Sequence, residues 1–496
     1  MTVSTSIHDI KTLILSFHPV IAIETVEEER VESLLEAVAS QLRLPLYQWT
    51  ITGGLVKFTN TPVLHGTTKP EVLLENLKKF KIEGIFLLKD FDDYLKNSSL
   101  SRQFREVMHQ FTQNHSTMIL TGTSINLPAE VNHSVVHYDL QLPEIPELYL
   151  VFRSIVQSLK VKHRIKVQLS SQDLNQLLRA LSGMTLNQAR QVLAYAALVD
   201  GKLFPGDIKR VLERKAQMIR EGGLLEYYPE EDNCYELGGF IGLKQWLRKA
   251  KVGFTKEAKS LNLNPPKGIL LVGIQGCGKS LSAKAIAREW QLPLLKLDAG
   301  RLYDKYIGES EKNFRQAIKL AESMSPVVLW IDEIEKAFSG GSDSQADGGL
   351  SRRLFGSFLT WLQEKREEVF VVATANDIST LPPEFLRKGR FDEIFFVDLP
   401  TAEERQEIFK IHLSLRKQDI TKFHLEKLIL ISDGYSGAEI EQSVISALYQ
   451  SLYLKQPLTT ELLLAEIQQM IPLSVSRKED IERLKKLASD RFLSVR

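Results

Sequence analysis

Cysteine is almost absent from this sequence of 496 residues, which contains only Cys234 and Cys277. Two cysteines are too few for the disulfide framework of a secreted domain or for a zinc site built from several thiolates. This scarcity indicates a reducing compartment. The first ten residues also lack a cationic segment followed by an apolar stretch, so no secretory signal is expected.

Long apolar runs and an excess of one charge are missing as well. The longest apolar runs, 268–274 and 327–331, are far shorter than the roughly 18 residues that a membrane span requires. We therefore expect a soluble protein with no membrane span. The 63 Lys and Arg residues balance 62 Asp and Glu residues, so no overall electrostatic field attracts nucleic acid or an anionic membrane. The overall charge balance does not exclude a local basic groove.

The composition is otherwise that of a globular protein, and the length predicts about three folding units. From residue 268 to 373, apolar runs typical of buried strands alternate with segments of helical periodicity. This order predicts an α/β fold with a parallel sheet between helices. Beyond Leu399 and Pro400, helical patterns follow at 403–415, 424–430, 438–453 and 460–470, which predicts a small helical lid.

The first half repeats this organisation in a weaker form. Strand patterns at 20–23, 85–90 and 118–121 alternate with helical patterns at 30–42 and 102–111. We infer a duplication, with a degenerate α/β domain followed by its own helical lid-like module. Shared amphipathic periodicity is the alternative explanation. The pairs of positions that match between the halves are Leu142-Pro143 with Leu399-Pro400, Gly183 with Gly434, and Thr185 with Ser436.

Residues 273–280 read Gly-Ile-Gln-Gly-Cys-Gly-Lys-Ser and fit the phosphate-loop pattern G-x4-G-K-S, between a predicted strand and a predicted helix. Glycines allow consecutive backbone N–H groups to converge on phosphate oxygens. Lys279 is expected to reach the β- and γ-phosphates and Ser280 to bind Mg²⁺, whereas Cys277 is expected to pack against the backbone. The residues of this segment expected to hold nucleotide are Gly273, Gly276, Cys277, Gly278, Lys279, Ser280 and Leu281.

Two acidic residues end the predicted strand 327–331. Asp332 is expected to hold hydrated Mg²⁺, and Glu333 to orient and deprotonate the attacking water. A solvated acidic turn is the alternative, against which the upstream phosphate loop argues. Asn376, at the end of the next predicted strand, is expected to hydrogen-bond the γ-phosphate or the water.

Arg387 and Arg390 lie three residues apart beyond the last predicted strand, beside a glycine. Local ion pairs with Asp392 or Glu393 would be adequate for one arginine. Two arginines so close together favour a more specific hypothesis, in which both insert as arginine fingers into the nucleotide site of a neighbouring subunit. Catalysis would then require an oligomer.

Together these motifs resemble the AAA+ ATPases of the classical AAA clade over residues 234–474. The resemblance implies ATP and Mg²⁺ as cofactors, ATP hydrolysis, and a ring that usually has six subunits. It also implies that Gly437 and Ala438 form part of the base and ribose pocket. The sequence departs from the family inside the phosphate loop, where most relatives carry two prolines and a threonine, and this puts the turnover rate in doubt. The matching segments are 237–240, 265–268, 273–280, 332–334, 375–376, 386–392 and 434–439.

Tyr306 and Ile307 resemble the loop that faces the central pore of protein-threading relatives. An aromatic side chain there would grip a polypeptide client of any sequence through apolar contact. An aromatic residue simply packed beneath the loop is the alternative.

The first half lacks these motifs. After the predicted strand 20–23, residues 24–30 read Glu-Thr-Val-Glu-Glu-Glu-Arg, with neither glycine nor a loop lysine. Asp90 aligns with Asp332, but Phe91 then stands in the place of Glu333. The first half is expected to bind no nucleotide and to serve as a platform, and an unrelated α/β domain is the alternative.

The whole arrangement looks like the hypothetical chloroplast reading frame forty-six family of cyanobacteria and plastids. That resemblance implies a cytoplasmic or plastid-stromal protein linked to the regulation of photosynthesis. We expect a Mg²⁺-dependent, oligomeric ATPase that remodels a protein client. The alternatives are a nucleic-acid-directed machine, against which the near-zero net charge argues, and a nucleotide-dependent scaffold. The predicted domains are the degenerate α/β domain (1–141), its lid-like module (142–222), the AAA+ core (223–398), the lid (399–474) and a C-terminal helix (475–496).

Overall fold

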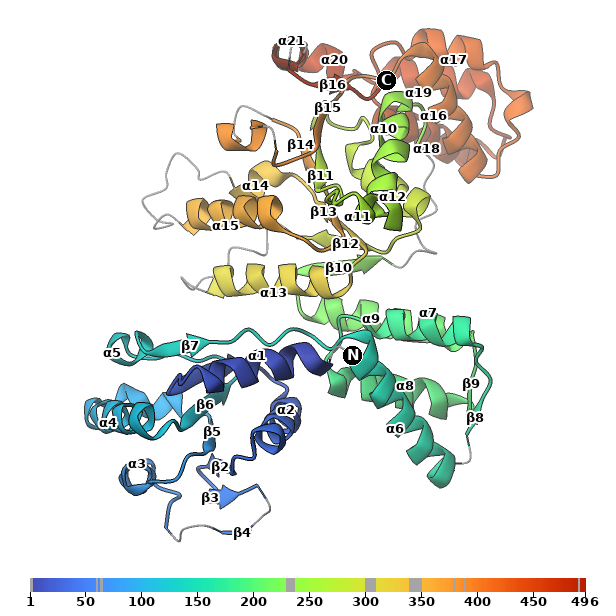
Figure 1. The fold of residues 1–496 in the computed structure, drawn as a ribbon. Helices are drawn as coiled ribbons and strands as arrows, with labels where there is room; N and C mark the ends of the chain where they lie inside the picture. The colour runs from blue at the N-terminus through green and yellow to red at the C-terminus, as the bar shows by residue number, and fades with distance from the viewer. Residues whose placement is uncertain are drawn as a thin grey trace. The chain divides into compact units, whose positions relative to one another are not determined.

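The computed structural model describes residues 3–58, 61–62, 66–163, 165–228, 237–298, 309–338, 350–377, 381–387, 389–488 and 491–496. The chain divides into two compact units, Met1–Val211 and Leu212–Arg496, each with its own sheet (Figure 1). The predicted α/β fold class is confirmed. The division lies inside helix α9 (Asp207–Glu221), and the sequence-based boundary at residues 222 and 223 stays a prediction.

The sheet of the second unit has seven strands in the order β10-β12-β13-β14-β11-β15-β16. Its described strands pair in parallel, except for the antiparallel pair β10 and β12. The predicted strand at 327–331 is confirmed, as is the alternation of strands and helices expected over residues 268–373. The strands are β10 (Leu225–Tyr228), β11 (Gly268–Gly273), β12 (Leu294–Leu297), β13 (Val327–Ile331), β14 (Val369–Ala375), β15 (Glu393–Val397) and β16 (Leu493–Ser494).

Helices cover both faces of this sheet (Figure 1). One face packs on α10 and α12, and the opposite face packs on α13 and α15. Strand β13 serves both cores because alternate side chains point to opposite faces, with Trp330 toward α12 and Leu329 toward α13 and α15. The helices are α10 (Ile241–Lys251), α11 (Lys256–Ser260), α12 (Lys279–Trp290), α13 (Glu309–Ser323), α14 (Ile334–Phe338) and α15 (Leu350–Glu364).

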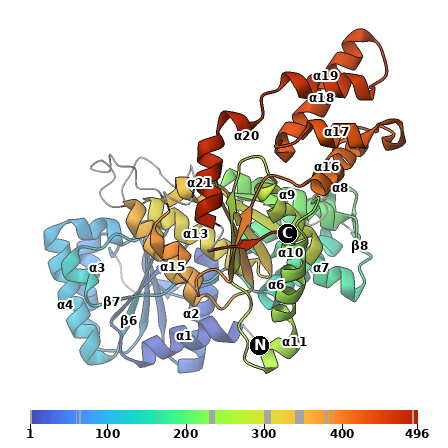
Figure 2. The ribbon, with the colours of Figure 1, turned by 90° about the horizontal axis from the view of Figure 1, so that it is seen from above.

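A helical lid follows the sheet and has a core of its own, which includes Phe409, Val444 and Leu463. Helices α20 and α21 then lead from the lid back to the sheet, where β16 pairs with β15 (Figure 2). The lid helices begin after capping residues such as Thr401 and Ser436, whose hydroxyls accept backbone N–H groups. The helices are α16 (Ala402–Leu415), α17 (Leu425–Ile431), α18 (Gly437–Leu454), α19 (Thr460–Gln469), α20 (Leu473–Ser476) and α21 (Lys478–Ala488).

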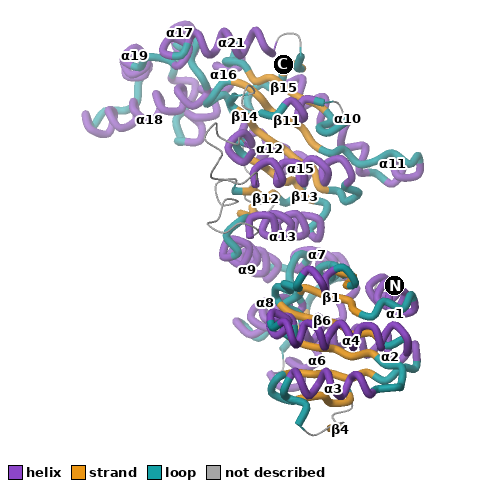
Figure 3. Tube along the Cα trace, turned by 90° about the vertical axis from the view of Figure 1, so that its left-hand side faces the viewer, coloured by secondary structure: helices purple, strands orange, loops and turns teal. Residues whose placement is uncertain are grey.

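The sheet of the first unit has the order β4-β3-β2-β5-β6-β1-β7. Its segment β2-β5-β6-β1-β7 matches β12-β13-β14-β11-β15 of the second unit, strand for strand. Figure 3 shows these strands between helices. The strands are β1 (Val20–Glu24), β2 (Leu46–Thr50), β3 (Gly54–Lys57), β4 (Thr61–Pro62), β5 (Ile85–Lys89), β6 (Thr117–Gly122) and β7 (Val135–His137).

The helices of the first unit repeat the layering. One face of the sheet packs on α1 and α2, and the other packs on α4 and α3. A helical module made of α6, α7 and α8 follows, and α8 begins after Thr185 as α18 begins after Ser436. The elements are α1 (Val3–Leu15), α2 (Glu28–Leu42), α3 (Pro70–Lys79), α4 (Ser98–Asn114), α5 (Ala129–Asn132), α6 (Ile145–His163), β8 (Lys166–Val167), α7 (Ser171–Leu181), α8 (Leu186–Val199) and β9 (Lys202–Leu203).

The faces of the strands show which residues correspond between the two sheets. In β5, Leu87 belongs to the core on the side of α2, so Lys89 points to that side. In β13, Trp330 belongs to the core on the side of α12, so Asp332 points to that side. Because α2 and α12 each follow the corresponding strand β1 or β11, Lys89 is the structural counterpart of Asp332.

The backbone after these strands agrees with this alignment. Asp90 and Glu333 both have left-handed backbone conformations, with φ of 50° and 48°. The sequence-based alignment of Asp90 with Asp332 is therefore wrong by one position, and Asp90 corresponds to Glu333. The error arose because the end of a strand pattern does not reveal which face a residue occupies.

Among the described residues, none of the helices combines the length and the apolar character needed to cross a bilayer.

Candidate functional site

The loop between β11 and α12 bends sharply at two glycines. Gly276 and Gly278 have φ of 74° and 89°, which side chains disfavour. A Cβ on Gly276 would lie 2.9 Å from Ser436 Oγ, so the loop approaches the lid more closely than another residue would permit. Helix α12 begins at Lys279 without a side-chain cap, and its positive end therefore favours an anion at this loop.

The loop also contacts the first turn of α18. The backbone N–H of Ala438 donates to the carbonyl oxygen of Gly276 at 2.9 Å, and a Cβ on Gly437 would lie 3.3 Å from the same oxygen. The structure thus brings together the predicted phosphate loop and the two lid residues that the family resemblance implied.

Lys279 is 6% exposed, and its ammonium donates to the carbonyl oxygens of Gly273 and Ile274 at 2.7 Å each. Burial lowers the pKa of Lys279 to about 8, because desolvation disfavours the charged form. An incoming phosphate would supply the negative charge that these two carbonyl groups provide only in part. The side chain is therefore placed to exchange carbonyl partners for phosphate oxygens.

Cys277 is buried, as expected, and its Sγ lies 3.7 Å from the carbonyl oxygen of Gln275. Burial raises the pKa of the Cys277 thiol to about 12. A thiol with this pKa is not the reactive thiolate of a redox or nucleophilic cysteine.

Asp332 lies at the carboxyl end of β13 and receives two hydroxyl groups. Ser280 Oγ donates to Asp332 Oδ1 at 3.0 Å, and Thr374 Oγ1 donates to the same oxygen at 2.6 Å. Hydroxyl and carboxylate oxygens are ligands that suit Mg²⁺, so Ser280 and Asp332 fit the ion that the sequence implied. Thr374 fixes the carboxylate, and sequence reasoning did not assign it this role.

Glu333 is held beside Asn376. The backbone N–H of Glu333 donates to Thr374 Oγ1 at 3.0 Å, and Asn376 Nδ2 donates to Glu333 Oε1 at 3.1 Å. Lys336 forms an ion pair with Glu333 Oε2 at 2.5 Å. Thr374 thus connects Glu333 to Asp332, and Asn376 bonds Glu333 directly.

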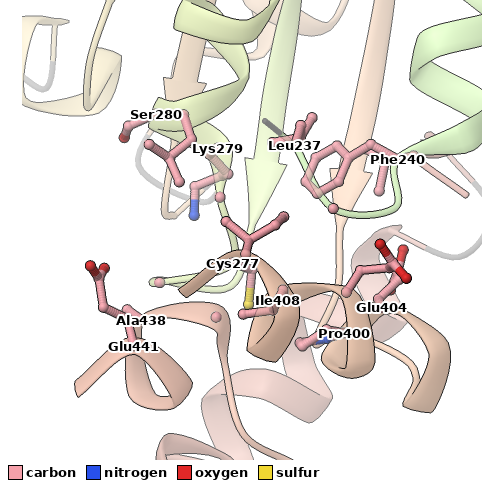
Figure 4. Close-up of a pocket in the computed structure, with 18 of the residues that line it drawn as sticks. Leu237, Phe240, Cys277, Lys279, Ser280, Pro400, Glu404, Ile408, Ala438 and Glu441 are labelled. Carbon is pink, nitrogen blue, oxygen red and sulfur yellow. The ribbon is translucent and has the colours of Figure 1, made fainter. Parts of the chain in front are cut away.

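A cavity of about 1170 Å³ lies between the core and the lid of the second unit. Figure 4 shows Leu237 and Phe240 next to each other, across the cavity from Glu441. Of the predicted residues, Gly273 is outside its lining but accepts the Lys279 hydrogen bond. The predicted residues that line it are Gly276, Cys277, Gly278, Lys279, Ser280, Leu281, Asp332, Glu333, Asn376, Gly437 and Ala438.

The sequence analysis missed part of this lining. Leu237 and Phe240 lie in the segment 237–240, which was matched to the family without a role for either residue. In the lid, the sequence predicted helices but not which residues face the cavity. Apolar walls of this kind suit an adenine base. The principal missed residues are Leu237, Phe240, Thr374, Asp398, Pro400, Glu404, Ile408, Glu441, Val495 and Arg496.

The last strand brings Arg496 to the connection between core and lid. Arg496 Nε forms an ion pair with Glu404 at 3.3 Å, and its guanidinium also donates to the carbonyl oxygen of Leu399. A Cβ on Gly242 would lie 2.4 Å from the carbonyl oxygen of Arg496, so only glycine permits this close approach. The chain at β16 therefore packs closely against the first turn of α10, at the edge of the cavity.

Arg387 and Arg390 do not belong to the described cavity lining. Arg387 is exposed, while Arg390 donates to the carbonyl oxygen of Glu384 at 2.7 Å. Tyr306 and Ile307 lie outside the described residues. The roles suggested for these four residues stay predictions.

Family models match three parts of the chain. Residues 269–399 match the ATPase family associated with various cellular activities (AAA). Residues 6–140 match the N-terminal domain, and residues 146–222 the second domain, of SpoVK-like AAA ATPases. The resemblance to AAA ATPases is therefore confirmed.

Two of the relatives align over nearly the full length, and a third aligns over part of it. The "uncharacterized AAA domain-containing protein ycf46" of Pyropia yezoensis is 39% identical over 489 residues, covering 97% of each chain. The protein of that name from Trieres chinensis is 40% identical over 483 residues, 96% of this chain and 95% of the relative. The "cell division cycle protein 48 homolog" of Archaeoglobus fulgidus is 34% identical over 211 residues, 42% of this chain and 28% of the relative.

Proposed function

We propose that this chain, which belongs to the ycf46 family of AAA-domain proteins, is a remodelling enzyme. It would couple Mg²⁺-dependent ATP hydrolysis to the remodelling of a protein client. ATP hydrolysis itself follows from the AAA ATPase family. The coupling to a client is the part that requires a test.

The observation that carries the proposal is the arrangement around Asp332. Ser280 and Thr374 donate to one oxygen of Asp332, and the buried Lys279 lies in the same loop. Mg²⁺ bound by Ser280 and Asp332 would neutralise charge on the phosphates. Lys279 and the backbone of α12 would bind the phosphate oxygens and hold the γ-phosphate in place.

Glu333 is the candidate base. Its carboxylate accepts from Asn376 through Oε1 and pairs with Lys336 through Oε2, and these two contacts orient it. Asn376, next to Glu333, is placed to hydrogen-bond the γ-phosphate or the attacking water, as the sequence suggested.

Self-association into a ring, with six subunits as the family usually has, is part of the proposal. Arg387 is exposed and outside the cavity of its own chain, which suits an arginine finger that completes a neighbour's site. The end of α18 also exposes Tyr449, Leu452 and Tyr453 by 70%, 73% and 81%. An apolar patch of this kind suits a subunit interface.

The client-binding element we propose is the loop with Tyr306 and Ile307, on the strength of its sequence. Location in the cytoplasm or plastid stroma and a link to photosynthesis belong to the same proposal and rest on the family resemblance.

The Glu333→Gln variant tests the function. It should bind ATP with Mg²⁺ but hydrolyse it at least a hundredfold more slowly, and an affinity pull-down in ATP should retain a protein client. Lys279→Ala is the matched control, because loss of nucleotide binding should abolish retention. Retained cellular function in Glu333→Gln would favour a scaffold, and ATPase stimulation by DNA but not by unfolded protein would favour a nucleic-acid machine.

A further inference from the structure

Helix α2 of the first unit corresponds to α12 of the second, residue for residue, near its amino end. Measured from the buried positions, Glu27 takes the place of Lys279 and Glu28 the place of Ser280. The charge of the loop lysine is thus reversed. The buried residues that share this spacing are Val31, Leu34 and Val38 in α2 and Ala283, Ile286 and Trp290 in α12.

A second reversal occurs at the end of β5, where Lys89 replaces the metal ligand Asp332. Lys89 Nζ lies 2.8 Å from Glu28 Oε2 and 2.5 Å from Glu32 Oε1. The pair Lys89–Glu28 corresponds to the pair Asp332–Ser280 in the second unit. An ammonium group attached to the chain therefore lies where the second unit would hold Mg²⁺.

A pair of corresponding threonine hydroxyls also differs between the two units. Thr121 on β6 corresponds to Thr374 on β14, and both side chains are buried. Thr374 donates to Asp332, whereas Thr121 Oγ1 has no hydrogen-bond partner among the described residues. Lys89 has no acceptor to offer. An unpaired buried hydroxyl is costly, and this one lies at the position where the second unit's threonine donates to a carboxylate.

Glu27 connects the α/β domain to the lid-like module. Glu27 Oε1 accepts the backbone N–H of Leu186 at 2.6 Å, at the first turn of α8, and Glu27 Oε2 accepts from Arg30 at 3.1 Å. Arg30 is 5% exposed and donates two bonds to Glu147 of α6, at 3.0 and 2.9 Å, and a third to the carbonyl oxygen of Gln141. Because Arg30 is paired with both carboxylates and makes four hydrogen bonds, these charges resist separation.

We infer that the first unit contains a closed former nucleotide site, in which Lys89 takes the place of Mg²⁺ and the Glu27–Arg30–Glu147 cluster takes the place of the nucleotide between sheet and lid-like module. The inference rests on the proposed function, because it identifies the second unit's site as the one that holds Mg-ATP. The first unit is consequently locked in one arrangement at every stage of the ATPase cycle.

Hydrogen–deuterium exchange of the full chain tests the locking. Saturating Mg-ADP should slow exchange in the first turns of α12 and α18 at least tenfold, and should change α2, α6 and α8 less than twofold. Equilibrium dialysis should give one nucleotide per chain. Two nucleotides per chain, or protection of α2 or α8 that persists in Lys279→Ala, would overturn the inference. Protection of neither α12 nor α18 would instead refute the proposed function and leave the variants below decisive.

Arg30→Met tests the buried cluster. Exchange in the first turns of α6 and α8 should rise at least tenfold, with or without Mg-ADP. The matched control is Arg190→Met, which removes an exposed ion pair of 3.2 Å between Arg190 of α8 and Glu29 of α2. The control should change exchange less than twofold, and equal effects of the two substitutions would contradict the inference.

Lys89→Ala tests the replacement of the metal and serves if Arg30→Met does not fold. Loss of the ammonium leaves Glu28 and Glu32 facing each other, and exchange in the first turn of α2 should rise several-fold. Millimolar Mg²⁺ should reverse that rise, while Na⁺ at equal ionic strength should not, because a divalent cation suits two carboxylates. No reversal by Mg²⁺ would show that Lys89 is only a surface ion-pair partner.

Discussion

The two corresponding threonines are expected to respond in opposite ways to the same substitution. Thr374→Val keeps the shape of the side chain but removes the donor to Asp332 Oδ1 at 2.6 Å and the acceptor of the Glu333 N–H at 3.0 Å. Thr121→Val removes a buried hydroxyl that has no partner among the described residues. The substituted side chains are 1% and 2% exposed, so burial does not distinguish them.

The magnitudes follow from the bonds that are lost. A hydrogen bond to a charged acceptor contributes about 1.5–3 kcal/mol, and losing a residue that orients a metal ligand typically costs 10–100-fold in metal affinity. Thr374→Val should therefore raise the Mg²⁺ concentration for half-maximal ATPase activity about 10–100-fold. Thr121→Val relieves an unpaired polar group and should stabilise the first unit by about 1–3 kcal/mol.

Two assays separate the outcomes. Mg²⁺ titrations of ATPase activity should show the loss for Thr374→Val and no change for Thr121→Val. Thermal unfolding followed by exchange in β6 should show the first unit of Thr121→Val melting roughly 2–4 °C higher per kcal/mol gained. Unchanged Mg²⁺ dependence in Thr374→Val, or destabilisation by Thr121→Val, would refute the reasoning about these two hydroxyls.

Three further predictions concern the cavity and its rim. Burial lowers the pKa of Lys279 to about 8, and the phosphates of ADP should raise it again, so ADP binding should take up roughly one proton at pH 9 and almost none at pH 7. Calorimetry in buffers of different ionisation enthalpy measures this proton uptake, and no uptake at pH 9 would contradict the prediction. Arg387→Ala should lower ATPase activity about a thousandfold, and mixing with Lys279→Ala subunits should restore part of it; failure of complementation argues against a finger in trans. Arg496→Ala should weaken nucleotide binding about fivefold, the equivalent of about 1 kcal/mol. Glu404→Gln should cause no larger loss, and the double variant should be no weaker than Arg496→Ala; additive losses would show that the pair is not coupled.

Much of the fold of the second unit could be predicted because its central strands are short, mainly apolar and separated by clear helical patterns. Strand β13 is predicted with its observed bounds, since its five residues are apolar and Pro326 and Asp332 flank them. Strands at the edges carry no such signal. β16 has two residues, and its pairing with β15 depends on the return of α21 to the sheet. Helix α1 and strands β2 and β3 were also missed, because tertiary partners outweigh their mixed local patterns.

The phosphate-loop motif could be identified because its characteristic residues lie in one short segment, 273–280. Thr374 could not be assigned, since its hydroxyl matters only through Asp332, 42 positions away in the sequence. Arg496 is more distant still from Glu404, and nothing in either helical or strand periodicity predicts their pairing. Sites assembled by the register of neighbouring strands need the sheet before their partners are known.

In each unit, charged groups hold the sheet and its helical module together. In the second unit a bound ligand would supply these charges, whereas in the first unit side chains supply them, and this difference decides where a conformational change can begin. A diffusible ligand stabilises the closed state only while it is bound, by about 2.7 kcal/mol at a hundredfold excess over its dissociation constant. Hydrolysis and release remove that stabilisation from the second unit. The Lys89 ammonium and the Arg30 guanidinium are covalently attached and cannot leave the first. Nucleotide-driven change within a chain should therefore begin at the connection of Leu399 and Pro400, and its counterpart at Leu142 and Pro143 should stay still.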